Sequence, residues 1–259
     1  MSDKSAITKK LSSANDNGCP WEIREAVLAS LADDFREKEE FIDPYIALTL
    51  ADIGYSAICE NHPTACWFCL LSLKEVIPLF PEAHHYPDFV QQVERIFEKF
   101  CEPAYRRDYP DYRDLAHDLL AELKYGCKPV PKLLTAARNE TGENPALAVK
   151  ALCRKLKKCP EERTPATALN LLAVAEDNKT LVGVNKHILD ILGFMIEDLQ
   201  IASTEGLDKR LKTMSFDASA FDTETRAAAS SMCEKIASLR NNAEKSLHRK
   251  KDGQIVHGL

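Results

Sequence analysis

Glycine is scarce in this chain, with only nine residues among 259. Strand-rich folds of this length need many tight turns with positive φ, which glycine supplies, whereas helix hairpins need few. The shortage therefore favours helices. The sequence also contains no stretch of 18 consecutive apolar residues. We therefore expect no membrane-spanning segment.

Several catalytic signatures are absent from the sequence as well. It contains no glycine-rich phosphate-binding loop, no Gly-x-Ser-x-Gly elbow and no His-Glu-x-x-His zinc motif. The sequence therefore does not support nucleotide hydrolysis, serine hydrolysis or zinc proteolysis. No cofactor is expected.

Cysteine usage indicates a reducing compartment. The nine cysteines are an odd number scattered along apolar faces, and the polar first residues lack the apolar core of a secretory signal. We therefore expect free thiols and a cytoplasmic protein.

The composition that remains is that of a globular protein, with 45% hydrophobic and 29% charged residues. Its net charge of −6 is unevenly distributed. Residues 20–123 carry −12 and residues 124–158 carry +7, which predicts surfaces of opposite sign.

Prolines mark the expected helix starts. Five of them lie 19 to 24 residues apart, each before apolar residues spaced i, i+3, i+4 and i+7: Pro20, Pro44, Pro63, Pro87 and Pro110. On the first helix this stripe comprises Ile23, Ala26, Val27, Leu31 and Phe35. Counting two helices per unit from Pro20 gives a period of 43 to 47 residues. The pattern predicts an all-α fold of antiparallel helix hairpins, stacked as in HEAT or armadillo repeats or in an irregular α-solenoid or bundle.

The same patterns divide the chain into four segments. We predict a disordered tail over 1–19, a regular helix-hairpin array over 20–126, a less regular helical region over 127–250, and a frayed tail over 251–259. The third segment is expected to contain one helix over 181–202, irregular structure over 204–221, and a long C-terminal helix.

The strongest chemical motif is Cys66-Trp67-Phe68-Cys69. Two thiols at i and i+3 share one face of a helix. Cys66 also falls in the first turn after Pro63, where the helix dipole favours a thiolate. A dithiol redox centre requires this arrangement, and the alternative is that both cysteines are small core residues.

The motif resembles that of the AhpD-like all-α peroxidases, in which a Glu, a Cys-x-x-Cys pair and a following His form a proton relay. Here Glu60 precedes the pair and His62 is the nearby imidazole, but Leu73 stands four residues after Cys69, where that family has His. The resemblance implies a thiol oxidoreductase with Cys66 as nucleophile, Cys69 as resolving thiol, and Glu60 or His62 as relay.

Two carboxylate–imidazole pairs have the spacing of metal ligands on a helix, Glu82 with His85 and Asp114 with His117. Pro81 and Pro87 bracket the first pair, so we expect it to lie in a loop. No metal site is predicted.

Two surface features could bind a partner. One is a basic helix face formed by Lys150, Arg154, Lys155, Lys157 and Lys158, which suits nucleic-acid phosphates or an acidic protein surface. The other combines the residue types that dominate binding hot spots: Tyr105, Arg106, Arg107, Tyr109, Tyr112 and Arg113. The alternative for the second is that these tyrosines only wall a turn between helices.

These observations predict a non-catalytic helical module that binds a protein partner through a charged, Tyr- and Arg-containing surface. An adaptor, a regulatory subunit and an effector or immunity-type protein all fit this description. The alternatives are dithiol chemistry at Cys66 and Cys69, and nucleic-acid binding through residues 124–158.

Overall fold

The computed structural model describes residues 2–36, 43–80, 82–142 and 144–255. Within these ranges every regular element is helical, with fourteen α-helices, three short 3-10 helices and no strand. The predicted all-α class is thereby confirmed. Across the same ranges, no helix combines the length and apolar character that a bilayer crossing demands.

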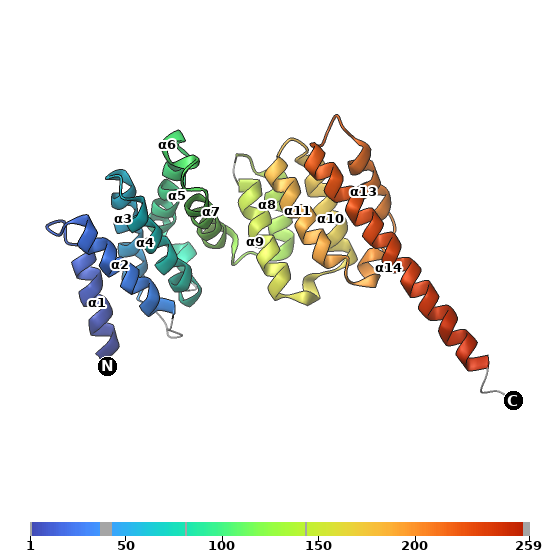
Figure 1. Cartoon of the computed structure of the whole chain (residues 1–259), viewed down its shortest axis with the longest axis horizontal. Helices are drawn as coiled ribbons and strands as arrows, with labels where there is room; N and C mark the ends of the chain where they lie inside the picture. The colour runs from blue at the N-terminus through green and yellow to red at the C-terminus, as the bar shows by residue number, and fades with distance from the viewer. Residues whose placement is uncertain (1, 37–42, 81, 143, 256–259) are drawn as a thin grey trace. The chain divides into compact units, whose positions relative to one another are not determined.

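Contacts divide the chain into two compact units, unit 1 (Met1–Cys127) and unit 2 (Lys128–Leu259). Figure 1 shows each unit as a group of packed helices, unit 1 in blue to green and unit 2 in yellow-green to red. The division falls in the short connector that follows α7 (Pro110–Tyr125) and precedes α8 (Val130–Asn139).

The helices of unit 1 form packed pairs, α1 with α2, α3 with α4, and α5 with α7. Two rows of contacts cross these pairs, one through α1, α3 and α5 and the other through α2, α4 and α7. The elements are α1 Ser2–Ala14, α2 Trp21–Arg36, α3 Pro44–Cys59, α4 Pro63–Val76, η1 Ile77–Leu79, η2 Ala83–His85, α5 Pro87–Cys101, α6 Pro103–Arg106 and α7 Pro110–Tyr125.

Proline opens five helices of unit 1, α3 to α7, where its missing N–H costs no hydrogen bond. The carboxylate of Asp43 adds a cap at the start of α3 by accepting a hydrogen bond from the Tyr45 N–H at 2.9 Å. The predicted proline-started helices are confirmed at Pro44, Pro63, Pro87 and Pro110, whereas the start of α6 at Pro103 was not predicted.

Helix α1 corrects the predicted disordered tail over 1–19. It buries Ile7, Leu11 and Ala14, spaced i, i+4 and i+7, and it contacts α2 and α3. The Ala14 carbonyl accepts a hydrogen bond from Nε of Arg24 at 2.7 Å. Because this helix was missed, the predicted pairing began one helix too late and joined α2 with α3.

The buried stripe of α2 also differs from the prediction. Leu31 and Phe35 are buried as expected, but Ile23 is 54% exposed and Arg24 is buried. The guanidinium of Arg24 lies 3.7 Å from the centroid of the Trp21 ring and donates to the Ala14 carbonyl. These partners offset the desolvation of a charged group that residue type alone places at the surface.

In unit 2, α8 contacts α9 and α10, α11 contacts α9 and α10, and α14 contacts α11, α12 and α13. The elements are α8 Val130–Asn139, α9 Asn144–Lys158, η3 Pro160–Glu162, α10 Pro165–Asp177, α11 Val182–Met195, α12 Leu199–Ala202, α13 Leu207–Phe216 and α14 Thr223–Ile255.

The structure corrects two predictions for residues 181–221 of unit 2. The single helix expected over 181–202 is interrupted between α11 and α12, where the carboxylate of Asp198 accepts a hydrogen bond from the Gln200 N–H at 2.8 Å. The stretch 204–221, expected to be irregular, contains α13, which buries Leu207, Leu211 and Met214 at i, i+4 and i+7.

The long C-terminal helix is present as α14 and extends further than expected. It reaches Ile255, so residues 251–255 of the predicted frayed tail have helical backbone. The rest of that tail, residues 256–259, lies outside the described residues.

Candidate functional site

Both thiols of the Cys66–Cys69 motif are completely buried on α4. Burial raises the pKa of the Cys66 thiol well above its ordinary value, and it also strongly raises the pKa of the Cys69 thiol. The expectation that the start of the helix would favour a Cys66 thiolate is therefore wrong. Proximity to the helix N-terminus stabilises the anion less than loss of water destabilises it.

Glu60 and His62, the predicted proton relay, lie in the turn between α3 and α4 and contact Trp21 of α2. The Trp21 indole N–H donates to the Glu60 carboxylate at 2.8 Å, and the His62 ring stacks on Trp21 with 5.0 Å between ring centroids. Both side chains therefore fasten α2 to the turn between α3 and α4. The burial of the two thiols and these contacts give dithiol chemistry no support.

Trp21 and Arg24 are structural residues that the sequence interpretation missed. A signal was available, because an indole pairs an apolar ring with a single donor and usually finds a partner when it is partly covered. The partners themselves lie 39 residues away in the chain at Glu60 and 10 away at Ala14, so no local pattern identifies them.

The predicted tyrosines come together in what we call the aromatic surface, formed by Trp67 of α4, Tyr105 of α6, Tyr109 and Tyr112. Trp67 and Tyr112 stack with 4.4 Å between ring centroids. Tyr109 lies 5.1 Å from Tyr112 and 6.1 Å from Tyr105. All four side chains are half-buried, so each ring is held by a neighbour and still reaches the solvent.

The aromatic surface rests on the buried ring of Phe100, which meets Tyr105 and Tyr112 edge-on. The Tyr105 hydroxyl lies 3.0 Å from Oδ1 of Asn61 and 3.3 Å from the Ile58 carbonyl, and its single proton can be donated to either oxygen. Burial raises the pKa of the Tyr112 hydroxyl, which therefore stays neutral at physiological pH. The tyrosines are thus fixed in place, which lowers the entropy cost of binding through them.

The three arginines next to the aromatic surface are more loosely held. Arg106 is exposed, and Arg107 has 91% of its side chain exposed while its Nε contacts Asp108 at 3.0 Å. Arg113 pairs with its neighbour Asp114 at 3.2 Å. The exposed Arg107 pair contributes little stability, so its guanidinium can exchange Asp108 for contacts with a partner. Arg113 is half-buried and less free to do so.

The basic face of α9 is present in unit 2, but only part of it projects into solvent. Lys157 and Lys158 are exposed, whereas Lys150 and Arg154, expected to point outward, are half-buried. The Lys155 ammonium donates to the Lys128 carbonyl at 2.9 Å, which fixes it against the connector.

Arg163 has a structural role at the end of α9. The Arg163 guanidinium donates to the carbonyls of Leu156 at 2.6 Å and Lys157 at 3.0 Å, and it lies 5.2 Å from the centroid of the Phe194 ring. A cation at this position satisfies the last carbonyls of the helix.

Within the described ranges, no group of three or more His, Cys, Asp or Glu side chains is arranged to hold a metal ion. Comparisons with protein-family models, with curated proteins and with solved structures find no significant match for this chain. The functional argument therefore rests on the aromatic surface and the basic face themselves.

Proposed function

We propose that this protein is a non-catalytic interaction module that binds a protein partner through the aromatic surface and its flanking arginines. The observation that carries the proposal is the half-buried set of rings in mutual contact on unit 1. Tyr, Trp and Arg dominate binding hot spots because they combine a large contact area with directional polar groups. The role of an adaptor or regulatory subunit fits such a surface.

The helix arrangement supports this proposal. We infer that unit 1 is built as a short HEAT-like or armadillo-like stack, because its helix pairs are crossed by two rows of contacts. Stacked pairs present side chains from successive helices on one continuous face. The aromatic surface has this character, since its rings come from α4, α6, the turn before α7, and α7.

A crosslinking experiment tests the proposal. A photoreactive amino acid at position 109 is expected to capture a protein partner in cells, whereas the same group at Tyr45, which is 65% exposed on α3, serves as the matched control. Tyr109→Ala and Arg107→Ala should each weaken binding of the captured partner about tenfold or more, whereas Tyr45→Ala should not. Equal capture at both positions, or unchanged affinity for folded Tyr109→Ala, would overturn the proposal.

Nucleic-acid binding is a second candidate, favoured by the exposed Lys157 and Lys158 on a segment rich in positive charge. It requires binding to an arbitrary duplex at about 50 mM salt that weakens steeply as salt rises. Lys157→Glu combined with Lys158→Glu should abolish that binding, whereas Lys186→Glu on α11 should not. No binding at low salt removes this candidate.

A further inference from the structure

The outer face of α13 in unit 2 carries an unusually exposed aromatic side chain. Phe216, the last residue of the helix, is 84% exposed, more than any other large hydrophobic side chain in the described ranges. It borders an open depression of about 660 Å³ lined by α13 residues and Asp217. Burial of an apolar side chain is favourable, so a partner that covers this ring gains affinity from it.

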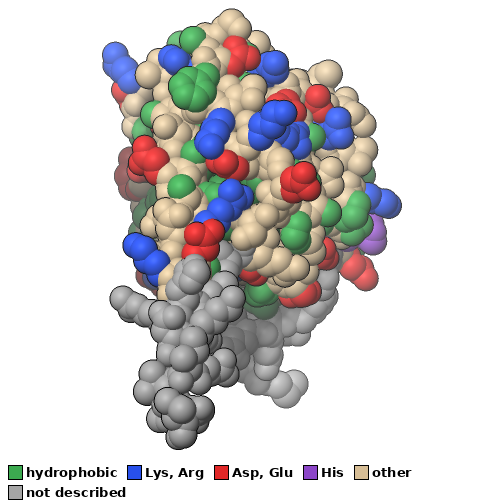
Figure 2. Space-filling view, turned by 90° about the vertical axis from the view of Figure 1, so that its right-hand side faces the viewer, with side chains coloured by type: hydrophobic (Ala, Val, Ile, Leu, Met, Phe, Trp, Pro, Cys, Tyr) green, Lys and Arg blue, Asp and Glu red, His purple; other side chains and the backbone are tan. Residues whose placement is uncertain are grey.

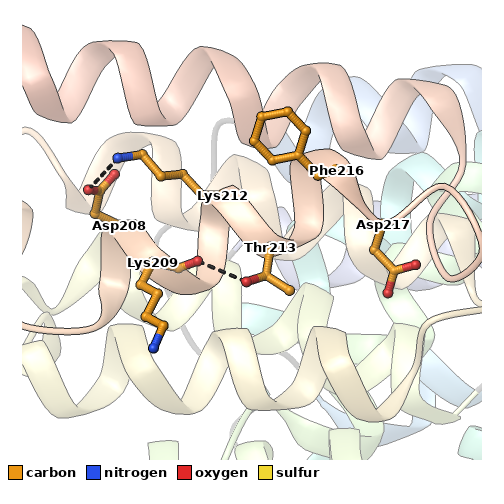
Figure 3. Close-up of a pocket in the computed structure, with 6 residues that line it drawn as sticks. All are labelled: Asp208, Lys209, Lys212, Thr213, Phe216 and Asp217. Carbon is orange, nitrogen blue, oxygen red and sulfur yellow. Dashed lines mark hydrogen bonds and ion pairs between the residues drawn. The ribbon is translucent and has the colours of Figure 1, made fainter.

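Charges are ordered along the same face. Lys209 and Lys212 lie toward the start of α13 together with Asp208, and Phe216 and Asp217 lie at its end (Figure 3). Thr213 lies midway, four residues from both Lys209 and Asp217. We call the two halves the lysine end and the Phe/Asp end.

The Phe/Asp end carries a fixed negative charge. One carboxylate oxygen of Asp217 accepts hydrogen bonds from the Ser219 hydroxyl at 2.6 Å and from the N–H groups of Ser219 and Ala220. These bonds lower the pKa of the Asp217 carboxyl, with the Ser219 hydroxyl as the largest cause. At the other end, the exposed Lys209 and Lys212 supply positive charge, although Lys212 also pairs with Asp208 at 3.0 Å.

We propose that this face is a self-association surface, on which a second copy of the chain docks antiparallel through its own α13. In a two-fold symmetric contact the same patch meets itself. An axis near Thr213 brings Lys209 of each copy opposite Asp217 of the other, because both residues lie four positions from Thr213. The two Lys212 side chains lie beside the axis, where each keeps its pair with Asp208 of its own chain. The Lys209–Asp217 attraction then occurs twice, and each Phe216 ring is covered by the first turn of the other copy's α13. The small Thr213 side chains allow the two helices to approach closely.

The surroundings favour a second copy over a ligand of one charge. Figure 2 views unit 2 from its α13–α14 side, where Lys and Arg side chains are interspersed with Asp and Glu. A surface of mixed sign gives no strong attraction to a polyanion such as nucleic acid. Lys209 and Asp217, which lie near opposite ends of the same face, are instead complementary to each other across an antiparallel contact.

Sedimentation velocity of the full chain tests the proposal. The mass is expected to rise from monomer to dimer between about 1 and about 100 μM, with the midpoint moving to higher concentration as salt screens the charge pairs. Phe216→Ala should shift the midpoint at least about tenfold. Tyr45→Ala, which removes an exposed ring from unit 1, should leave it unchanged.

Charge exchange identifies the contact itself. A Lys209→Glu chain and an Asp217→Lys chain should each remain monomeric, whereas an equimolar mixture should form a heterodimer because opposite charges again face each other. Circular dichroism checks that Asp217→Lys folds. If it does not, Asp217→Asn, which can keep the hydrogen bonds from Ser219 and Ala220, should still weaken dimerisation. A wild-type chain that stays monomeric, a dimer unaffected by Phe216→Ala, or folded charge variants that do not associate on mixing would each overturn the proposal.

Discussion

At the residue scale, Cys66 shows how two environmental effects on one thiol compete. Its place in the first turns of α4 favours the thiolate by about 0.3–1 kcal/mol at exposed sites. Complete burial acts against the anion, and removing a charge from water costs several kcal/mol. Burial wins, and the pKa of the thiol is raised. A Cys-x-x-Cys motif therefore does not by itself define a redox centre.

Thiol labelling of the native protein measures this outcome. Cys66 and Cys69 are expected to react with a soluble thiol reagent at least about tenfold more slowly than the exposed Cys127, because only the accessible thiolate attacks. Unfolding in denaturant should equalise the rates. Rapid labelling of Cys66 in the folded chain would restore the dithiol interpretation.

The raised pKa values of the two thiols also predict an alkaline loss of stability. Below the ordinary thiol pKa near 9, both states keep the proton and the stability is fully present. Above it the unfolded chain releases protons that the folded chain retains, so the free energy of unfolding falls by about 1.4 kcal/mol per pH unit for each thiol. Denaturant titrations from pH 8 upward should show a smaller slope for Cys66→Ala than for Cys127→Ala, and equal slopes would contradict the expectation.

At the element scale, Gly54 allows α3 to approach its neighbours closely. A Cβ added there would lie 3.1 Å from Cβ of Cys69 on α4 and 3.3 Å from Cδ1 of Ile96 on α5. Gly193 on α11 has more room, since an added Cβ meets Cε of Met232 only at 3.8 Å. Alanine substitutions at these two positions therefore distinguish the effect of helix propensity from the effect of packing.

Alanine substitution should therefore have opposite effects at these glycines. At Gly54 the gain in helix propensity is about 1 kcal/mol or less, and overpacking costs about 1–3 kcal/mol, so a net loss of stability is expected. Gly193→Ala should stabilise the protein by about 0.5–1 kcal/mol. Denaturant unfolding checks both, and stabilisation by Gly54→Ala would show that α3, α4 and α5 can separate without cost.

The first helix provides a direct test of the corrected N-terminal segment. Leu11 is only 3% exposed between α1 and its neighbours, so Leu11→Ala should cost about 2–4 kcal/mol. Lys9→Ala, on the exposed face, should change stability by less than about 0.5 kcal/mol. A disordered tail would show no effect for either variant.

Helix starts could be predicted from the sequence because proline acts locally, as at Pro44, Pro63 and Pro110. Helices α1 and α13 could not, because their buried positions are few and lie among polar residues. The clustering of the tyrosines could be predicted, because they lie close together in the sequence. The part that Trp67 plays in the aromatic surface could not, because its stack on Tyr112 joins residues 45 positions apart.

At the scale of the whole molecule, charge follows the division into two units. Unit 1 contains 13 Lys and Arg against 23 Asp and Glu, a net charge of −10, and unit 2 contains 21 against 17, a net charge of +4. Each unit also has its own buried apolar residues, with Phe89 and Phe100 in unit 1, and Leu171 and Ile188 in unit 2. A core within each unit is the physical condition for independent folding.

Residues 1–127 and 128–259, produced as separate chains, are therefore expected to fold on their own. Their helical circular dichroism should add up to that of the full chain, and each should unfold cooperatively. At neutral pH the first should bind an anion exchanger and the second a cation exchanger, because their net charges have opposite signs. If either chain lacks helical structure alone, its stability depends on the other unit, and the division by contacts would not be a division into folding units.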